Sequence, residues 1–391
     1  MAAALRRRGA WAPSRGTLRR LALASVVANI GIVVTGGAVR LTSSGLGCPT
    51  WPRCTDESYV TTPEMGVHGV IEFGNRLLTF AVGLIALAGV VAAVLRTRRD
   101  RAAAPAPGAR PAAGRPPSVL RPAVLVLLGI PAQAVVGGLT VLTDLNPWVV
   151  GCHFLVSMAI IAAAYVFWRR TVPAPPAAPV PGPLRTLAWL TVLASAAVTV
   201  VGTVVTGSGP HSGDAGARRT GLDLETVSQV HVDLVFLLLG LSVALWLALR
   251  AVGAPRPAVR AAATLVLVEL AQGLVGAVQY ATGLPAVAVG LHMLGACLVW
   301  LATVAVLYRT GGPRAAAPAD PGCAGRAPAS APPAGPASAA DAAAGTAPAG
   351  PASAGPGSAT PAAVPAPAAA PSPTVPADAS ADPVPAGGPG H

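Results

Sequence analysis

Eight long apolar runs constrain this chain more than any other feature of its sequence. They lie at roughly 19–39, 66–95, 121–142, 148–168, 184–206, 226–250, 260–281 and 286–308. About 20 residues of helix cross the roughly 30 Å hydrocarbon layer of a bilayer. Only 11% of the residues are charged, against roughly 25% in a soluble globular protein. The sequence therefore predicts an all-α integral membrane protein with eight transmembrane helices.

The arginines give these helices a direction. Arginine-rich segments precede the first run, separate the second from the third, the fourth from the fifth and the sixth from the seventh, and follow the eighth. The other loops carry fewer arginines and seven of the fifteen acidic residues. Since cytoplasmic loops carry the excess of basic residues, we expect a multi-pass protein of the cell membrane with both termini in the cytoplasm. The net charge is +12, but arginines spaced between apolar runs argue against nucleic-acid binding.

The composition divides the chain into four parts. Residues 1–18 form a basic cytoplasmic arm, 19–170 and 184–310 are the two helical halves, and 311–391 is rich in Ala and Pro. That last part has almost no large apolar residues, so we expect a disordered cytoplasmic tail. The stretch 101–118 resembles it and should be a flexible loop. The first run lacks an obvious cleavage site, which favours a retained helix over a signal peptide.

The two halves resemble one another. Each places a histidine twenty residues after a glutamine of the preceding run: Gln133 with His153, and Gln272 with His292. The first and fifth runs also share Val-Thr-Gly, at 34–36 and 205–207. Such internal similarity predicts two four-helix bundles of the same topology, related by a pseudo-twofold axis along the membrane normal.

Four histidines lie a few residues inside the second, fourth, sixth and eighth runs, which enter from the outer face: His68, His153, His231 and His292. Imidazole in a bilayer is costly unless it is paired or ligated. Two histidines facing each other across a four-helix bundle can hold one haem iron. Interhelical hydrogen bonds are the alternative. We expect His211 to lie in an outer loop facing water and assign no role to the terminal His391.

Glu72 and Arg76 lie close to the first of these histidines. Glu72 is four residues after His68 and four before Arg76, so the three share one helix face. Glu72 could act as an acid, base or proton relay beside a redox centre. It could equally form a structural ion pair with Arg76.

Two cysteines, Cys48 and Cys54, share one short outer loop, where disulfides persist. The pair could be a structural staple or could be redox-active. The prolines and Trp51 should hold the loop against the bilayer interface. Cys152 and Cys297, inside apolar runs, are expected to be small buried packing residues.

These motifs resemble those of haem A synthases, the membrane enzymes that convert haem O to haem A for terminal oxidases. The resemblance covers about residues 20–310. Its most specific part is Gly36-Gly-Ala-Val-Arg40-Leu-Thr-Ser-Ser-Gly-Leu-Gly-Cys48-Pro-Thr-Trp-Pro-Arg-Cys54. Further matches are Ile71-Glu72-Phe-Gly-Asn75-Arg76, Gly151-Cys-His153-Phe and Gly290-Leu-His292.

The resemblance implies different roles for the two halves. It places a haem B cofactor, with its iron, between His231 and His292, and the substrate haem O near His153 and Arg76. Glu72 matches the essential carboxylate of the family, and Cys48 and Cys54 match its outer-loop disulfide. The implied reaction oxidises the C8 methyl group of haem O to a formyl group by successive hydroxylations. The implied partners are a haem O synthase, an oxidase assembly factor and a second copy of the chain.

The sequence departs from the family pattern at two places. The family often reads Glu-x-x-His, whereas the fourth position here is Asn75. Laying the second run on the sixth puts Asn75 opposite His231, so the expected ligand is absent. His68, about one turn before Glu72, is the candidate substitute. The outer loop at 207–224 also has no cysteines, so it cannot form a second disulfide.

Two other functions fit parts of the pattern. A diheme b-type electron-transfer protein would also carry haem, but it would need neither Glu72 nor an open substrate site. A secondary transporter would share the repeats and the intramembrane charges. A transporter predicts no Soret band in the purified protein.

Overall fold

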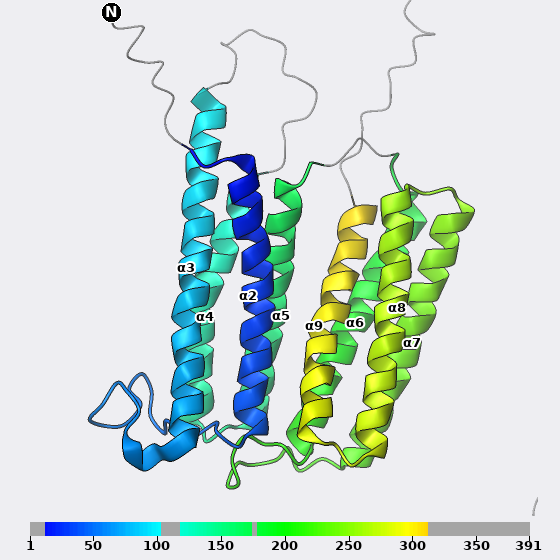
Figure 1. Cartoon of the computed structure of the whole chain (residues 1–391). Coiled ribbons are helices and arrows are strands. Elements are labelled where there is room, and N and C mark those ends of the chain that lie inside the picture. The colour runs from blue at the N-terminus through cyan, green and yellow to red at the C-terminus, as the bar shows by residue number, and fades with distance from the viewer. Residues whose placement is uncertain (1–11, 103–117, 174–177, 312–391) are drawn as a thin grey trace, which may run out of the picture. The chain divides into compact units, whose positions relative to one another are not determined.

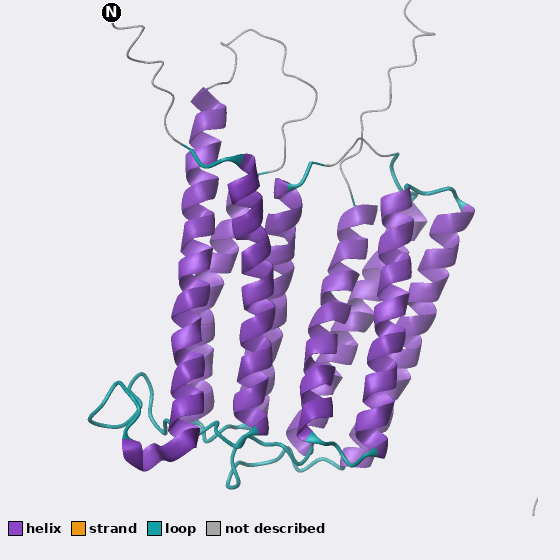
Figure 2. Cartoon of the chain, in the orientation of Figure 1, coloured by secondary structure: helices purple, strands orange, loops and turns teal. Residues whose placement is uncertain are grey.

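The computed structural model describes residues 12–102, 118–173 and 178–311. Most of the predicted arm, most of the predicted flexible loop and residues 312–391 of the predicted tail lie outside the described residues. Within these ranges the fold is all-helical, and eight helices are long and apolar enough to cross a membrane (Figure 2). They are α2 (Arg15–Leu41), α3 (Gly66–Ala102), α4 (Leu120–Leu142), α5 (Pro147–Thr171), α6 (Gly182–Ser208), α7 (Leu224–Ala251), α8 (Arg256–Ala281) and α9 (Ala286–Thr310). A short 3-10 turn, η1 (Pro63–Met65), precedes α3.

The helices begin where local chemistry can cap them. Ser14 accepts a hydrogen bond from the backbone of Thr17, so α2 starts four residues before the apolar run. Asn146 and Asp223 cap α5 and α7 in the same way, through the backbone N–H groups of Trp148 and Thr226. Side-chain oxygens at this position satisfy donors that the first helical turn leaves free. The eight predicted spans are therefore confirmed, with ends that extend beyond the apolar runs.

Each half of the chain forms a ring of four antiparallel helices (Figure 1). In the first ring α2 and α4 each contact both α3 and α5, and in the second α6 and α8 each contact both α7 and α9. Helices α3 and α5 are therefore diagonal in their ring, as are α7 and α9. The rings meet where α2 and α5 pack against α9, around Met158, Ile161 and the buried Cys297. Cys152, by contrast, is exposed on α5, so the expectation that it would be buried is wrong.

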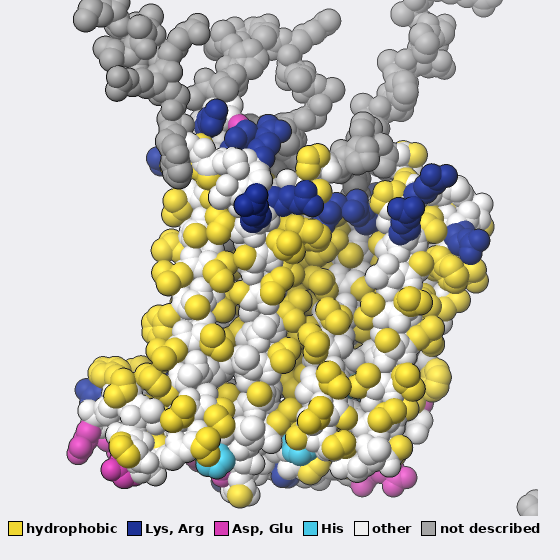
Figure 3. Space-filling view, in the orientation of Figure 1, with side chains coloured by type: hydrophobic (Ala, Val, Ile, Leu, Met, Phe, Trp, Pro, Cys, Tyr) yellow, Lys and Arg dark blue, Asp and Glu magenta, His cyan; other side chains and the backbone are white. Residues whose placement is uncertain are grey.

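Polar side chains separate to the two ends of the helices (Figure 3). Arginines cluster at one end, and the acidic residues and histidines lie mainly at the other. Large apolar side chains between them face outward, among them Phe80, Leu267 and Val287, which are 72%, 68% and 77% exposed. Such a surface suits lipid rather than water. We call the two ends the arginine-rich end and the histidine end; the positive-inside rule predicts that the first faces the cytoplasm.

Candidate functional site

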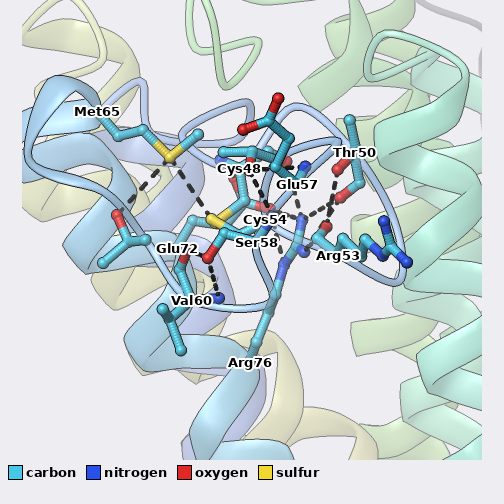
Figure 4. Close-up of a disulfide and its surroundings, with 12 residues drawn as sticks. Cys48, Thr50, Arg53, Cys54, Glu57, Ser58, Val60, Met65, Glu72 and Arg76 are labelled. Atoms are coloured by element: carbon cyan, nitrogen blue, oxygen red, sulfur yellow. Dashed lines mark hydrogen bonds and ion pairs between the residues drawn. A yellow bond between two sulfur atoms is a disulfide. The ribbon is translucent and has the colours of Figure 1, made fainter.

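The loop between α2 and α3 is anchored to the start of α3 by Glu72 and Arg76 (Figure 4). The backbone N–H of Cys48 donates to Glu72 Oε2 at 2.7 Å. Arg76 donates to the carbonyl oxygens of Cys48, Thr50 and Arg53 at 2.9–3.1 Å. Arg76 Nη2 also lies 2.6 Å from Glu72 Oε1. Both carboxylate oxygens of the buried Glu72 are thus engaged in an ion pair and in holding the loop.

The cysteines of this loop lie directly above that anchor. Cys48 and Cys54 form a disulfide and are both fully buried. The Cys54 Sγ atom lies 3.6 Å from the Met65 sulfur (Figure 4). Since the backbone of Cys48 is bound by Glu72 and Arg76, the disulfide and the carboxylate belong to one connected structure.

The half-buried Trp51 packs against α4, and its expected place at the bilayer interface stays a prediction. A Cβ atom added at Gly138 of α4 would lie 2.4 Å from Trp51 Cδ2. Only glycine leaves room for the indole ring at this place. The loop therefore rests on α3 through its backbone contacts and on α4 through this ring.

Asn75, and not His68, occupies the interior position on α3. The Thr35 hydroxyl of α2 donates to Asn75 Oδ1 at 2.7 Å, and a Cβ atom at Gly36 would lie 3.7 Å from Asn75 Nδ2. His68 is exposed near the helix start, where its Nδ1 lies 2.9 Å from the Ser44 hydroxyl. The amide therefore faces α2 at the level where the family pattern carries an imidazole.

The other three histidines share one packing arrangement. Each ring lies against a glycine of the preceding helix, and a Cβ atom there would lie 3.1 Å from the ring Cε1 atom. The pairs are Gly137 with His153, Gly202 with His231, and Gly276 with His292. Glutamines fix two of the helices: Gln133 Nε2 donates to the His153 carbonyl at 3.0 Å and Gln272 Nε2 to that of His292 at 2.8 Å. Gln133 also binds the Ser157 hydroxyl.

These contacts define which positions of the two halves correspond. Gly36 faces Asn75 as Gly202 faces His231, so Gly36 corresponds to Gly202. The Val-Thr-Gly match would instead pair Gly36 with Gly207, whose Cβ position faces Pro147 and Thr220. The spatial correspondence therefore differs by five residues from the one that the short motif gives.

The histidine nitrogens suit a haem iron in the second half. The Nδ1 atoms of His153, His231 and His292 are buried without a hydrogen-bond partner. His231 and His292 come from the diagonal helices α7 and α9, and the rings are close enough for a charge on one to act on the other. Paired imidazoles on facing helices fit axial ligation of haem. His153 has no such ionisable partner among the described residues.

One connection between loops at the histidine end was not expected. Arg40, at the end of α2, donates to the carbonyl oxygens of His211 and Thr206 at 2.6 and 2.9 Å. His211 Nε2 in turn lies 2.8 Å from the Leu284 carbonyl oxygen. His211 is half-buried and joins the two rings, so the expectation that it would only face water is wrong. Arg40 inside a family motif was the available signal.

The fold and this end of it define a class: a polytopic helical membrane protein with interior histidines beneath a disulfide-bearing loop. The COX15-CtaA family model, described as cytochrome oxidase assembly protein, matches residues 19–211. The relatives include two proteins named heme A synthase, from Geobacillus kaustophilus (strain HTA426) and Geobacillus thermodenitrificans, which are 26% and 28% identical over 136 residues. These comparisons make the N-terminal half of the chain similar to haem A synthases.

The matched part of the relatives is limited. The alignments cover 34% of this chain and 37% of the length of each relative. The family match ends at residue 211, before His231 and His292. The assignment of those two histidines therefore depends on the geometry of the second ring.

Proposed function

We propose that this protein is a haem A synthase, which oxidises the C8 methyl group of haem O to a formyl group by successive hydroxylations. The observation that carries the proposal is the asymmetry of the two rings. The second presents the rings of His231 and His292 across its interior, whereas the first presents His153 and the amide of Asn75. A complete ligand pair suits a permanent cofactor, and an incomplete one suits a substrate that must leave.

His231 and His292 would hold haem B and its iron through Nε2. When bound, haem B supplies one-electron transfer, which gives electrons from substrate oxidation a way out of the first ring. Gly202 and Gly276 leave space for the imidazoles, and Gln272 fixes the backbone of His292. These residues therefore orient the ligands.

The substrate haem O would bind in the first ring beside His153. Asn75 is a poor iron ligand, and its oxygen already accepts a hydrogen bond from Thr35. Glu72 precedes Asn75 by three residues, about 4.5 Å along α3. We propose Glu72 as the acid–base group of this site. Because Glu72 also binds Arg76 and the Cys48 backbone, a proton exchange there would change how the disulfide loop is held.

The same proposal includes the surroundings of the enzyme. The chain would lie in the cell membrane with its arginine-rich end in the cytoplasm. A haem O synthase would supply the substrate, and an oxidase assembly factor would receive the product. A second copy of the chain is a further candidate partner.

The test is to purify the protein after co-expression with a haem O source, record its visible spectrum and extract its haems. We expect haem A, or its hydroxylated intermediate, from the wild type and neither from Glu72→Gln. His231→Ala and His292→Ala should each lose haem B. Haem B alone, with wild type and Glu72→Gln indistinguishable, would instead support the diheme electron-transfer function. Asn75 argues against that alternative, because it leaves the first ring without a second histidine at this level.

A further inference from the structure

A layer of buried polar side chains crosses the middle of the second ring. Each of its four helices contributes one member: Ser195, Ser242, Glu269 and Thr303, which are 1%, 1%, 6% and 1% exposed. The Ser242 hydroxyl donates to Glu269 Oε1 at 2.8 Å, and the Thr303 hydroxyl donates to Ser195 Oγ at 3.3 Å. The proposed haem ligands and the family motifs use none of these residues.

The spacing along the helices places the layer at one depth. Glu269 comes seven residues before Gly276, and Ser242 eleven residues after His231. At 1.5 Å per residue, these spacings put the layer about 10–16 Å further into the membrane than the histidines and their glycines. The other two helices repeat both spacings, with Ser195 before Gly202 and Thr303 after His292.

Glu269 carries a carboxyl group with one free oxygen in this layer. Its Oε2 atom is buried without a hydrogen-bond partner, and Ser242 is its one polar partner among the described residues. No charged side chain of the described residues acts on it. Cys297 of α9 faces α2 and α5. The other titratable and charged groups of α7, α8 and α9 lie toward the helix ends; they are Glu225, His231, Asp233, Arg250, Arg256, Arg260, Tyr280, His292, Tyr308 and Arg309. An isolated carboxylate is costly in such surroundings.

The first ring has no such carboxyl group. Counting from the corresponding glutamines, Gln133 and Gln272, puts Ile130 at the position of Glu269. Ala86 and Ala164 replace Ser242 and Thr303 and are both buried in an apolar core. The acid is therefore confined to the ring that presents two histidines.

A cavity lies between this layer and the arginine-rich end of the helices, without reaching the layer itself. It has a volume of about 410 Å³ and lies between α5, α8 and α9. Arg260 and Arg309 line it, together with Thr264 and Ala302. Thr264 is five residues from Glu269, about 7.5 Å along α8, and Ala302 precedes Thr303 of the polar layer.

We propose that Glu269 is a proton-binding site linked to the reduction of the haem iron between His231 and His292. With haem B held by His231 and His292, its reduction by one electron would be accompanied by transfer of one proton from water to the Glu269 carboxylate, and its reoxidation by return of that proton to water. The physical reason is electrostatic. The extra positive charge of the oxidised iron stabilises the carboxylate, and reduction removes that charge. The inference rests on the proposed function, whose substrate oxidation supplies the electron.

The test is a spectroelectrochemical titration of haem B in the purified holoprotein between pH 6 and 9, with chemical mediators as electron donors. In the wild type the midpoint potential should fall as the pH rises, by up to about 59 mV for each tenfold change in proton concentration. Glu269→Gln keeps the size and the Ser242 hydrogen bond but cannot titrate, so it should remove this dependence.

Two further measurements separate the outcomes. The infrared difference spectrum between oxidised and reduced protein should contain a carboxyl C=O band that Glu269→Gln lacks. Ser242→Ala should keep the pH dependence and move it to higher pH, because the carboxylate loses a donor. Equal pH dependence in wild type and Glu269→Gln would overturn the linkage while leaving haem A formation intact. A purified chain that binds no haem would overturn the proposed function as well.

Discussion

The glycine beneath His292 offers a sharp perturbation of the proposed haem B site. Gly276→Ala adds a Cβ atom 3.1 Å from His292 Cε1. Optimal carbon–carbon contacts lie at about 3.5–4.0 Å, so the ring must move by roughly 0.4 Å or more. Overpacking of this size costs about 1–3 kcal/mol. If the whole cost falls on the ligand geometry, haem B binds about 5- to 150-fold more weakly.

Helix α8 supplies the matched control. A Cβ atom added at Gly273, one turn earlier, meets nothing within 4 Å. Both substitutions improve helix propensity by about 1 kcal/mol, since alanine loses less backbone entropy than glycine. Gly273→Ala should therefore be at least as stable as the wild type and keep its full haem content.

The assay is the ratio of haem B to protein after purification, followed by dilution to measure haem loss. We expect a lower ratio and faster loss for Gly276→Ala only. Equal haem retention in Gly276→Ala, Gly273→Ala and the wild type would refute the reasoning that His292 is a ligand held in place by this glycine.

Three other perturbations test the histidine end. Arg76→Gln leaves a buried carboxylate without its cation, which costs about 3–5 kcal/mol, so reduction of the loop disulfide by dithiothreitol should be much faster. Asn75→His should raise the haem content per chain, because it restores an imidazole facing α2, whereas His68→Ala should leave it unchanged. Hydrogen bonds from Thr226 lower the pKa of the helix-capping Asp223. Its contribution to stability is therefore present above its ordinary pKa of 3.8 and is lost as the pH falls through the lower folded value. Asp223→Asn keeps the cap but has no carboxyl group to protonate. Its melting temperature should therefore fall less than that of the wild type when the pH is lowered.

Each of these three predictions would be contradicted by a specific result. Arg96→Gln breaks an exposed pair with Asp100 and should cost less than about 1 kcal/mol. A disulfide reduced equally fast in this control and in Arg76→Gln would contradict the anchoring role. Haem lost in His68→Ala, with Asn75→His unchanged, would identify His68 as the ligand. Acid unfolding curves of the same shape for wild type and Asp223→Asn would contradict the capping account.

The number and type of the helices follow directly from the sequence. An apolar run of about 20 residues has few alternatives to a membrane helix, since its backbone groups must be satisfied internally. The positions of His153 and His292 also follow, because they lie at fixed distances from helix starts and from a glutamine that recurs in both halves.

Contacts made by loops do not follow in the same way. The contact of Trp51 with α4 depends on the space at Gly138, for which the loop sequence carries no signal. The alignment of α2 with α6 that the Val-Thr-Gly motif gives differs by five residues from the spatial correspondence, because a three-residue motif carries little information. Glu269 has a sequence signal of its own, since it is the single acidic residue of the apolar run at 260–281.

In the proposed function, the chain of contacts from Arg40 through His211 to Leu284 would have a kinetic consequence. It ties the end of α2 to the loops of the second ring beside the histidine end. Electron tunnelling between two redox groups slows steeply as their separation grows. A bridge that holds the rims of both rings together would keep that separation constant while substrate enters and product leaves. Arg40→Gln, which weakens this bridge, should lower the mean rate of electron transfer and broaden the distribution of rates without changing either binding site.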